Sequence, residues 1–473
     1  MIERWSRDQV LALAPDASSQ KAAQGVAVPG KWSLRGTTGM VLYGACKGSG
    51  ANPYLACVDL TEPAYRCSCP SRKFPCKHAL GLLLMWSADG VPEVEAAPQW
   101  VTEWLETRAE RAAKAAARLE ADRAEGAAKG AATEQGDAGR SGVGVSARSG
   151  GKRGAVAGAE SVRHARVASG LAELERWLAD QVRQGLAGVA EHEWDGLAKR
   201  LIDAQAPGVA GIVSRLAQVR AEENWPGRLL EEYALINLLA VAYRRRADLP
   251  GPLARTVLIR AGFPVTREEV LARPAVRDLW DVLGRRDEQH DRLTARRVWL
   301  RGRRTGRPAL ILSFAPQGQP LDASLVTGTV IDADVTFYPG AAPLRALVAT
   351  RHGTIPASDL VSSHGTIPEP GPAGRPAAPH PAVPPGVSPE EALDEVARAL
   401  AEDPWTESWP LVLEAVVPER ASIGGLPLHP RSRDPWRLIA VSGGHPLTVA
   451  AEWTPQGLRP LTTWDEDGTA VIL

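Results

Sequence analysis

The sequence predicts a multidomain α+β protein, and three observations support this fold class. The chain has 473 residues, more than a single hydrophobic core usually serves, so about two to four domains are expected. The hydrophobic periodicity changes from short strand-like runs to helical stripes, then to strands again, and ends in a mixed pattern. Finally, 45 glycines and 38 prolines are more than a compact domain needs, which predicts flexible connectors between modules.

The first predicted module spans residues 1–99 and has a β-β-α order. Short apolar runs bounded by Pro-containing turns predict its strands, at residues 40–45, 54–59 and 64–66. A helix is predicted over residues 76–86, because three leucines recur there at helical spacing, Leu80, Leu83 and Leu84. We expect these leucines to pack on the strands.

A cluster of sulfur and imidazole side chains stands between the last strand and this helix. Cys67 and Cys69 form a Cys-x-Cys pair, and Cys76 and His78 form a Cys-x-His pair six residues later. Structural zinc takes four such ligands in a tetrahedron, each about 2.0–2.3 Å from the ion, so the members of each pair must be close in sequence. The segment therefore predicts one structural Zn²⁺ held by these four residues. We predict no catalytic residue and no other cofactor.

Three other interpretations of the cysteines are less consistent with the sequence. Disulfides are disfavoured because five cysteines is an odd number and the N-terminus lacks the apolar region of a secretion signal. A catalytic Cys76–His78 pair would need a base within hydrogen-bond reach of the thiol, which neighbours at one helix end rarely provide. Chance clustering does not explain why Cys46 and Cys57 stand apart on predicted strands, where we interpret them as small buried apolar residues.

The same four residues carry a family resemblance. The pattern Cys67-x-Cys69 followed by Cys76-x-His78 resembles the SWIM-type zinc finger, over roughly residues 35–88. The wider chain is similar to stand-alone bacterial SWIM zinc finger proteins. The resemblance implies zinc binding and a role in DNA binding or protein–protein contact. A basic rim around the finger, made of exposed side chains that could meet phosphate or an acidic protein surface, is predicted at Arg66, Arg72, Lys73 and Lys77.

The middle of the chain is predicted to be helical. Residues 100–168 begin with strong helix formers and continue, over residues 126–162, as a Gly-, Ala- and Ser-rich segment interpreted as a disordered linker. Residues 169–290 show helical stripes of apolar residues and predict an all-α domain, with a central helix at 229–242 and a last helix at 275–283. We expect the linker to separate the finger and this domain into independent bodies.

The last part of the chain is predicted to hold two further modules. Residues 291–350 form a β-rich segment, with strands expected at 297–300, 309–314, 330–338 and 344–348. Residues 351–388 are a Pro-rich linker. Residues 389–473 are a mixed α/β module, in which Ser388 precedes Pro389 and Glu391 in the pattern of a helix N-cap.

Charge is balanced overall, with 55 basic and 55 acidic residues, but not locally. Residues 285–307 contain nine arginines against three acidic residues, and residues 389–473 contain fourteen acidic residues against six arginines. The basic stretch could bind nucleic acid, with Trp299 available for stacking on bases. We favour the alternative, in which it is a solvated face or packs on the acidic C-terminal module.

These features lead to one functional expectation and two alternatives. We expect a cytoplasmic, non-enzymatic adaptor that binds protein partners, since no catalytic motif and no apolar run of membrane-spanning length is present. The first alternative is a DNA-binding protein that uses the finger and the basic stretches. The second is an enzyme with an unrecognised site in the C-terminal half.

Overall fold

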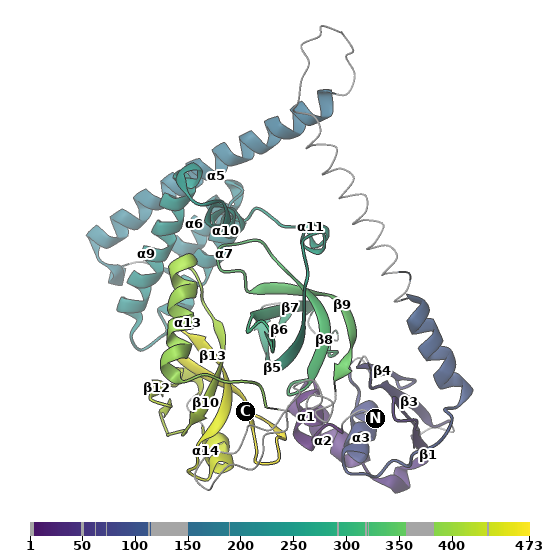
Figure 1. The fold of residues 1–473 in the computed structure, drawn as a ribbon. Coiled ribbons are helices and arrows are strands. Elements are labelled where there is room, and N and C mark those ends of the chain that lie inside the picture. The colour runs from purple at the N-terminus through teal and green to yellow at the C-terminus, as the bar shows by residue number, and fades with distance from the viewer. Residues whose placement is uncertain are drawn as a thin grey trace.

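The computed structural model describes residues 4–48, 52–61, 63–71, 73–111, 114, 150–188, 190–290, 293–316, 319, 321–355, 383–432 and 435–473. A β-barrel lies at the centre of the molecule (Figure 1). The N-terminal module, the helical bundle and the C-terminal module are arranged around it. The prediction of a mixed fold with a β-β-α module, an all-α domain, a β-rich segment and a C-terminal α/β module is confirmed.

The N-terminal module is an antiparallel sheet covered on both faces. Its strands pair in sequence order: β1 (Trp32–Thr37), β2 (Val41–Cys46), β3 (Tyr54–Asp59) and β4 (Ala64–Cys67). One face packs against α3 (Lys77–Ser87), which also contacts α1 (Arg7–Ala12) and α2 (Ala17–Val26). A helix over residues 99–111 lies on the other face, where Trp100 meets Tyr43 edge to face with 6.3 Å between ring centroids.

Most of this module agrees with the sequence-based expectation. The three predicted strands correspond to β2, β3 and β4, and the three leucines of α3 are buried in the core beneath them. Strand β1 was missed, because only part of its side chains are buried and it lacks a clear alternation. The helix predicted from residue 100 is confirmed as far as residue 111, and most of its remainder lies outside the described residues.

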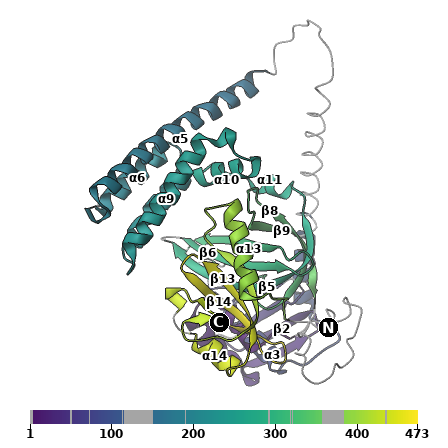
Figure 2. The same ribbon diagram turned by 60° about the vertical axis from the view of Figure 1, so that its left-hand side comes forward.

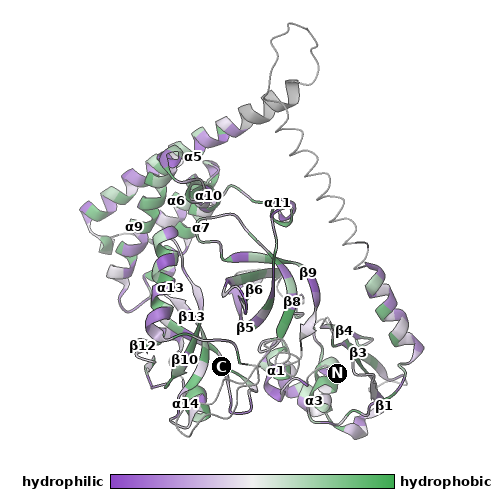
Figure 3. Ribbon diagram, viewed as in Figure 1, coloured by the Kyte–Doolittle hydropathy of each residue, from purple (hydrophilic) through white to green (hydrophobic). Residues whose placement is uncertain are grey.

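The helical bundle follows as predicted, with different boundaries. Its main helices are α5 (Gly150–Gln184), α6 (Glu191–Asp203), α7 (Pro207–Ser214), α9 (Trp225–Arg244) and α10 (Gly251–Ala261). The short helices α8 (Leu216–Val219) and α11 (Arg267–Leu271) and the 3-10 turns η2 (Leu186–Gly188) and η3 (Arg246–Asp248) complete it. Hydrophobic and hydrophilic residues alternate along the helices (Figure 3), and the apolar ones meet in a core that includes the fully buried Trp194.

Two boundaries of the bundle correct the prediction. Helix α5 begins at Gly150, so residues 150–162 are helical and do not belong to a disordered linker, whose other part lies outside the described residues. The helix predicted at 275–283 is wrong, because strand β5 begins at Val276. Trp280 and Val282 both point into the barrel core at a period of two, which is the spacing of a strand.

The barrel is closed by five strands. They are β5 (Val276–His290), β6 (Leu293–Gly302), β7 (Pro308–Pro316), β8 (Val330–Phe337) and β9 (Arg345–Ile355), in the order β5-β6-β7-β9-β8. All neighbours are antiparallel except β7 and β9. The four strands predicted for residues 291–350 are confirmed, and β5 adds the fifth. Residues 356–382, which contain most of the predicted Pro-rich linker, lie outside the described residues.

The C-terminal module is a sheet with helices, as predicted. Helix α13 (Pro389–Glu402) begins with the expected capping box, in which the Ser388 hydroxyl accepts a hydrogen bond from the backbone amide of Glu391. The sheet has the order β10-β13-β14-β15, formed by Trp409–Val416, Leu447–Thr454, Gly457–Trp464 and Ala470–Ile472. The small hairpin β11–β12 (Ser422–Ile423, Leu426–Pro427), the turn η4 (Pro430–Ser432) and α14 (Trp436–Ser442) lie beside it. In the turned view, α13 lies between the bundle and this sheet (Figure 2).

The finger module packs on the barrel and on the C-terminal end of the chain, while its separation from the helical bundle stays a prediction. The Tyr65 hydroxyl on β4 donates to the carbonyl oxygen of Ala323 at 3.4 Å, and Val326 from the same barrel loop joins the core of the N-terminal module. Helix α1 also contacts β15 at the C-terminal end of the chain. These contacts join segments more than 250 residues apart, and no local pattern in the sequence reports them.

The basic stretch packs on the acidic C-terminal module, which was the favoured of the two interpretations. Arg286 on β5 binds the buried carboxylate of Glu452, and Arg301 on β6 binds Glu395 of α13 through two hydrogen bonds of 3.1 and 2.8 Å. Trp299 is fully buried between the barrel and the C-terminal sheet. It is therefore not available to stack on bases.

Candidate metal centre

The structure brings the four predicted ligand residues together at the junction of β4 and α3. Cys67 ends β4, Cys69 lies in the following loop, Cys76 is the N-cap of α3, and His78 is in its first turn. One ligand atom from each residue lies within 4.8 Å of the other three. The Cys67 Sγ and His78 Nδ1 atoms are 3.7 Å apart, close to the roughly 3.6 Å that separates sulfur and nitrogen ligands in a tetrahedral zinc site.

Local backbone contacts hold the first pair of ligands in place. Cys67 is paired with Ala56 of β3, and the next residue continues the pairing, because the Ser68 amide donates to the Leu55 carbonyl at 2.9 Å. The Ser68 hydroxyl in turn accepts from the Leu55 amide at 2.9 Å. Cys67 is therefore anchored to a central strand of the sheet, and Cys69 directly follows the anchored Ser68.

The second pair is fixed by the start of helix α3. Cys76 has an extended backbone, with φ −76° and ψ 166°, so its side chain precedes the first helical turn. The His78 ring lies against the ring of Tyr54 with 4.8 Å between centroids. Cys76 is 1% exposed and His78 is 3% exposed, whereas Cys67 and Cys69 are half-buried. The cluster is therefore open to solvent mainly on the side of the loop.

The electrostatics of the cluster suit a metal that takes thiolate ligands. Hydrogen bonds from the Cys67 thiol, from His78 and from the Ala79 backbone amide lower the pKa of the Cys76 thiol. The hydrogen bond to Cys76, together with burial, raises the pKa of the Cys67 thiol. The Cys76 thiol therefore loses its proton most readily, and the protons of the cluster remain on the neighbouring thiols. A divalent cation at the centre would replace those protons and stabilise all the sulfurs as thiolates.

The remaining cysteines behave as apolar core residues. Cys46 and Cys57 are buried on β2 and β3, and burial raises the pKa of the Cys57 thiol to about 12. All five cysteines are free thiols. The disulfide interpretation is therefore excluded for this structure.

The predicted basic rim is only partly available. Lys73 forms an ion pair with Asp16 at 2.6 Å, which ties the finger loop to α2. Arg66 and Lys77 are exposed, and Arg72 lies outside the described residues. The sequence did not indicate the Asp16 contact, because that residue caps a helix far from the finger in the chain.

Four soft ligands at a strand-to-helix junction define a zinc-finger protein. Residues 57–87 match the family model of the SWIM zinc finger, and residues 162–261 match that of the SWIM-associated four-helix bundle domain. The chain thus contains a SWIM-type zinc finger, as the sequence resemblance indicated, and a bundle domain of the kind associated with it. The second match corresponds to α5 through α10, which were predicted as helices but not recognised as a domain of this family.

Two further comparisons gave no match, neither among curated proteins nor among solved structures. Within the described residues, no helix combines the length and the apolar character that a membrane span requires.

Proposed function

We propose that this protein is a non-enzymatic adaptor that binds protein partners, built around one structural Zn²⁺ held by Cys67, Cys69, Cys76 and His78. The zinc site is supported by one observation: the ligand atoms of these four residues all lie within 4.8 Å of one another. Four protein ligands leave no open position on the ion for a substrate, which is the mark of a structural rather than a catalytic zinc. Thiolate ligands also suit the reducing cytoplasm in which we place the adaptor.

The distribution of charge supports protein partners over DNA. Several arginines of the basic stretch are paired within the molecule, including Arg296 with Asp287 at 2.7 Å and Arg303 with Asp281 at 2.8 Å. Arginines committed in this way contribute little to phosphate binding, which depends on free cations. At the finger, the described residues then offer a DNA duplex only Arg66 and Lys77, which are few for a specific contact.

The bundle offers an apolar contact surface. On α9, Leu230, Leu235 and Leu238 are 49%, 36% and 42% exposed, although they belong to the longest apolar stretch of the domain. Exposed apolar residues gathered on one element often mark a protein contact site. We infer that the bundle, rather than the finger, supplies the main partner surface, while the zinc holds the N-terminal module in shape against the barrel.

Polar groups that could serve an enzyme are engaged in structural contacts. The carboxylate of Glu452 forms ion pairs with Arg286 and Arg459. Asp278 is fully buried and accepts hydrogen bonds from the backbone amides of Arg304 and Thr305. A general base needs a lone pair free for substrate. This arrangement supports the non-enzymatic proposal over a site in the C-terminal half.

An affinity purification of the full chain from its native cell, with and without nuclease, tests the adaptor proposal. We expect the same protein partners in both samples, and loss of those partners when Leu235 and Leu238 are replaced by Glu. A matched control, Lys199→Glu, changes an exposed position on α6 and should keep them. Partners that vanish with nuclease would instead support DNA binding, and the absence of any partner would contradict the adaptor proposal.

A further inference from the structure

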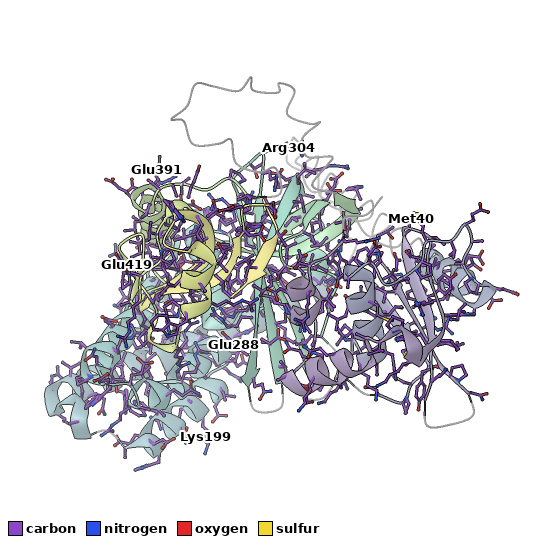
Figure 4. All side chains as sticks on the ribbon, turned by 90° about the horizontal axis from the view of Figure 1, so that it is seen from below. Met40, Lys199, Glu288, Arg304, Glu391 and Glu419 are labelled. Atoms are coloured by element: carbon purple, nitrogen blue, oxygen red, sulfur yellow. The ribbon has the colours of Figure 1, made fainter. Side chains whose placement is uncertain are left out.

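A continuous cleft runs between the bundle, the barrel and the C-terminal module. Its larger part has a volume of about 770 Å³ and its smaller part about 430 Å³, and both are lined by Arg215, Arg260 and Arg297. Glu288, near the end of β5, lines the larger part and is labelled in the view from below (Figure 4). A volume of this size accommodates a short stretch of a macromolecular ligand or a small molecule.

We propose that this cleft binds a peptide segment of a partner protein in which acidic side chains stand beside apolar ones. The proposal rests on the adaptor function and names the chemistry of its partner. It also assigns a site to residues outside the zinc finger, which none of the motifs in the sequence indicates.

The walls of the cleft are tied to one another, so the cleft exists before a ligand arrives. Trp405, from the loop after α13, is buried in the core of the bundle, and its indole N–H donates to the Leu235 carbonyl oxygen at 2.9 Å. Arg260 of α10 donates to the Trp405 carbonyl oxygen and lies 3.6 Å from a carboxylate oxygen of Asp403. A preformed site binds without first ordering its own side chains.

Part of the lining is apolar. Leu216 and Ile212 come from the bundle, Trp453 from β13, and Leu235 reaches the rim of the cleft from α9. Leu235 also belongs to the exposed leucine surface of α9 described above, so the cleft and that surface are continuous. A partner segment lying in the cleft could extend apolar side chains onto both.

The arginines of the cleft fall into two groups. Those of the first group are neutralised: Arg228 lies 3.3 Å from Glu232, Arg297 lies 3.4 Å from Glu288, and Arg459 lies 3.5 Å from Glu452. The second group has no carboxylate within ion-pair distance among the residues that the structure describes, and consists of Arg215, Arg345 and Arg431.

The three arginines without a carboxylate partner line the cleft and are accessible to a ligand. All three side chains are exposed, and the guanidinium of Arg345 lies over the ring of Tyr338 at 4.2 Å from its centroid. Arg215 stands where the two parts of the cleft join, with Arg431 in the larger part and Arg345 in the smaller. Free guanidinium groups along an apolar groove are complementary to carboxylates spaced along a peptide.

Nucleic acid is the other polyanion to consider, because of the barrel. Its strand order, with the third strand parallel to the fifth, is that of five-stranded Greek-key barrels of the OB type, whose second and third strands often bind oligonucleotides. Here that face, β6–β7, borders the cleft. However, the facing walls carry acidic groups, among them Glu231 and Glu407, which are 62% and 64% exposed. Their ion pairs with Arg228 and Arg260 leave few free cations for a strand that bears one negative charge per nucleotide, whereas a peptide with one or two carboxylates needs only the free arginines.

The test uses the full-length, zinc-loaded protein and a displayed library of random short peptides, with binding of the selected peptides measured by fluorescence anisotropy. We expect enrichment of sequences in which Asp or Glu stands beside large apolar residues. Replacing both Arg215 and Arg431 by Glu should weaken these peptides at least tenfold, about 1.4 kcal/mol, and should favour basic peptides when the selection is repeated. Arg176→Glu, an exposed position on α5 outside the cleft, should leave binding unchanged.

Several results would overturn the cleft proposal. These are no enrichment of peptides, enriched peptides that bind the double variant as well as the wild type, or a single-stranded oligodeoxythymidine that binds through the two arginines in place of peptides. The adaptor proposal is judged separately. If the partners from the native cell are retained by the double variant, that proposal stands and only the cleft is wrong.

Discussion

The side-chain amide of Gln9 donates a hydrogen bond to the carbonyl oxygen of Thr327 at 3.0 Å, and both residues are buried. Gln9 lies on α1 at the start of the chain, and Thr327 lies in the loop before β8 of the barrel. The Gln9 carbonyl oxygen Oε1 also accepts from the Ser6 amide at 2.7 Å, so the same side chain caps its own helix. One side chain thus stabilises helix α1 and at the same time joins the zinc-finger module to the barrel.

Replacing Gln9 by Ala should therefore destabilise more than a surface helix. The change leaves the buried Thr327 carbonyl without its donor and removes half of a capping box, so we expect the free energy of unfolding to fall by about 1–3 kcal/mol. Urea denaturation followed by tryptophan fluorescence measures this. Lys21→Ala, an exposed position on α2, is the control and should change the stability by less than about 0.5 kcal/mol. Equal stabilities for the two variants would show that the bond carries no net energy.

Removing the metal should unfold the N-terminal module. Binding free energies of structural zinc are on the order of 10 kcal/mol, and the core that contains Cys76 also contains Trp5, Trp32 and Trp86. A chelator should therefore shift the tryptophan emission to longer wavelength and reduce near-ultraviolet circular dichroism.

The ligand set is checked by metal analysis of variants. Cys69→Ala should contain well under one zinc per chain, because a three-ligand site is much weaker. Cys46→Ala removes a buried cysteine that is not in the cluster and should keep its zinc. If Cys69→Ala retains its full metal content, or if the wild type contains none, the proposed centre is wrong.

The sequence predicted those parts of the molecule that depend on local patterns. The zinc ligands, the strands β2 to β4 and the helix N-cap at Ser388 all follow from spacings of a few residues, and the structure has them in place. The features that the sequence could not predict depend on contacts between distant segments of the chain. Residues 275–283 were predicted as a helix, whereas β5 is fixed by pairing in the barrel, and its Asp278 and Asp281 find their partners Arg304 and Arg303 more than 20 residues later in the chain.

The cleft illustrates the same limit. Its free cations Arg215, Arg345 and Arg431 come from three modules, and each looks in the sequence like any other surface arginine. What distinguishes them is the absence of a neighbouring carboxylate among the described residues, which only the packed structure defines. By contrast, the acidic C-terminal module and the basic stretch could be matched from composition alone, because their charges are opposite and concentrated.

The carboxylate of Glu452 should be the most sensitive of the ion-pair positions. It is 1% exposed and binds Arg286 and Arg459, so Glu452→Gln leaves two arginines beside a neutral, buried amide. Breaking a buried pair from one side typically costs about 3–5 kcal/mol, and we expect a loss in that range by urea denaturation. Asp180→Asn removes the partner of Arg183 in an exposed pair and should cost less than about 1 kcal/mol. A loss for Glu452→Gln no larger than that of the control would contradict the structural role of this cluster.

His429 should make the stability of the protein fall in mildly acidic solution. It is 3% exposed, and burial, followed by the positive charge of Arg459, lowers its pKa from 6.5 to about 4, with Arg431 and Arg286 adding to the effect. The folded protein therefore keeps a neutral imidazole where the unfolded chain already binds a proton. The resulting stabilisation is complete above pH 6.5, decreases as the pH falls toward about 4, and then stays level. Urea denaturation at a series of pH values should show a smaller decrease over this window in His429→Gln than in the wild type, whereas His192→Gln, at an exposed position on α6, should follow the wild type. If His429→Gln and the wild type lose stability in parallel, another group controls the acid sensitivity.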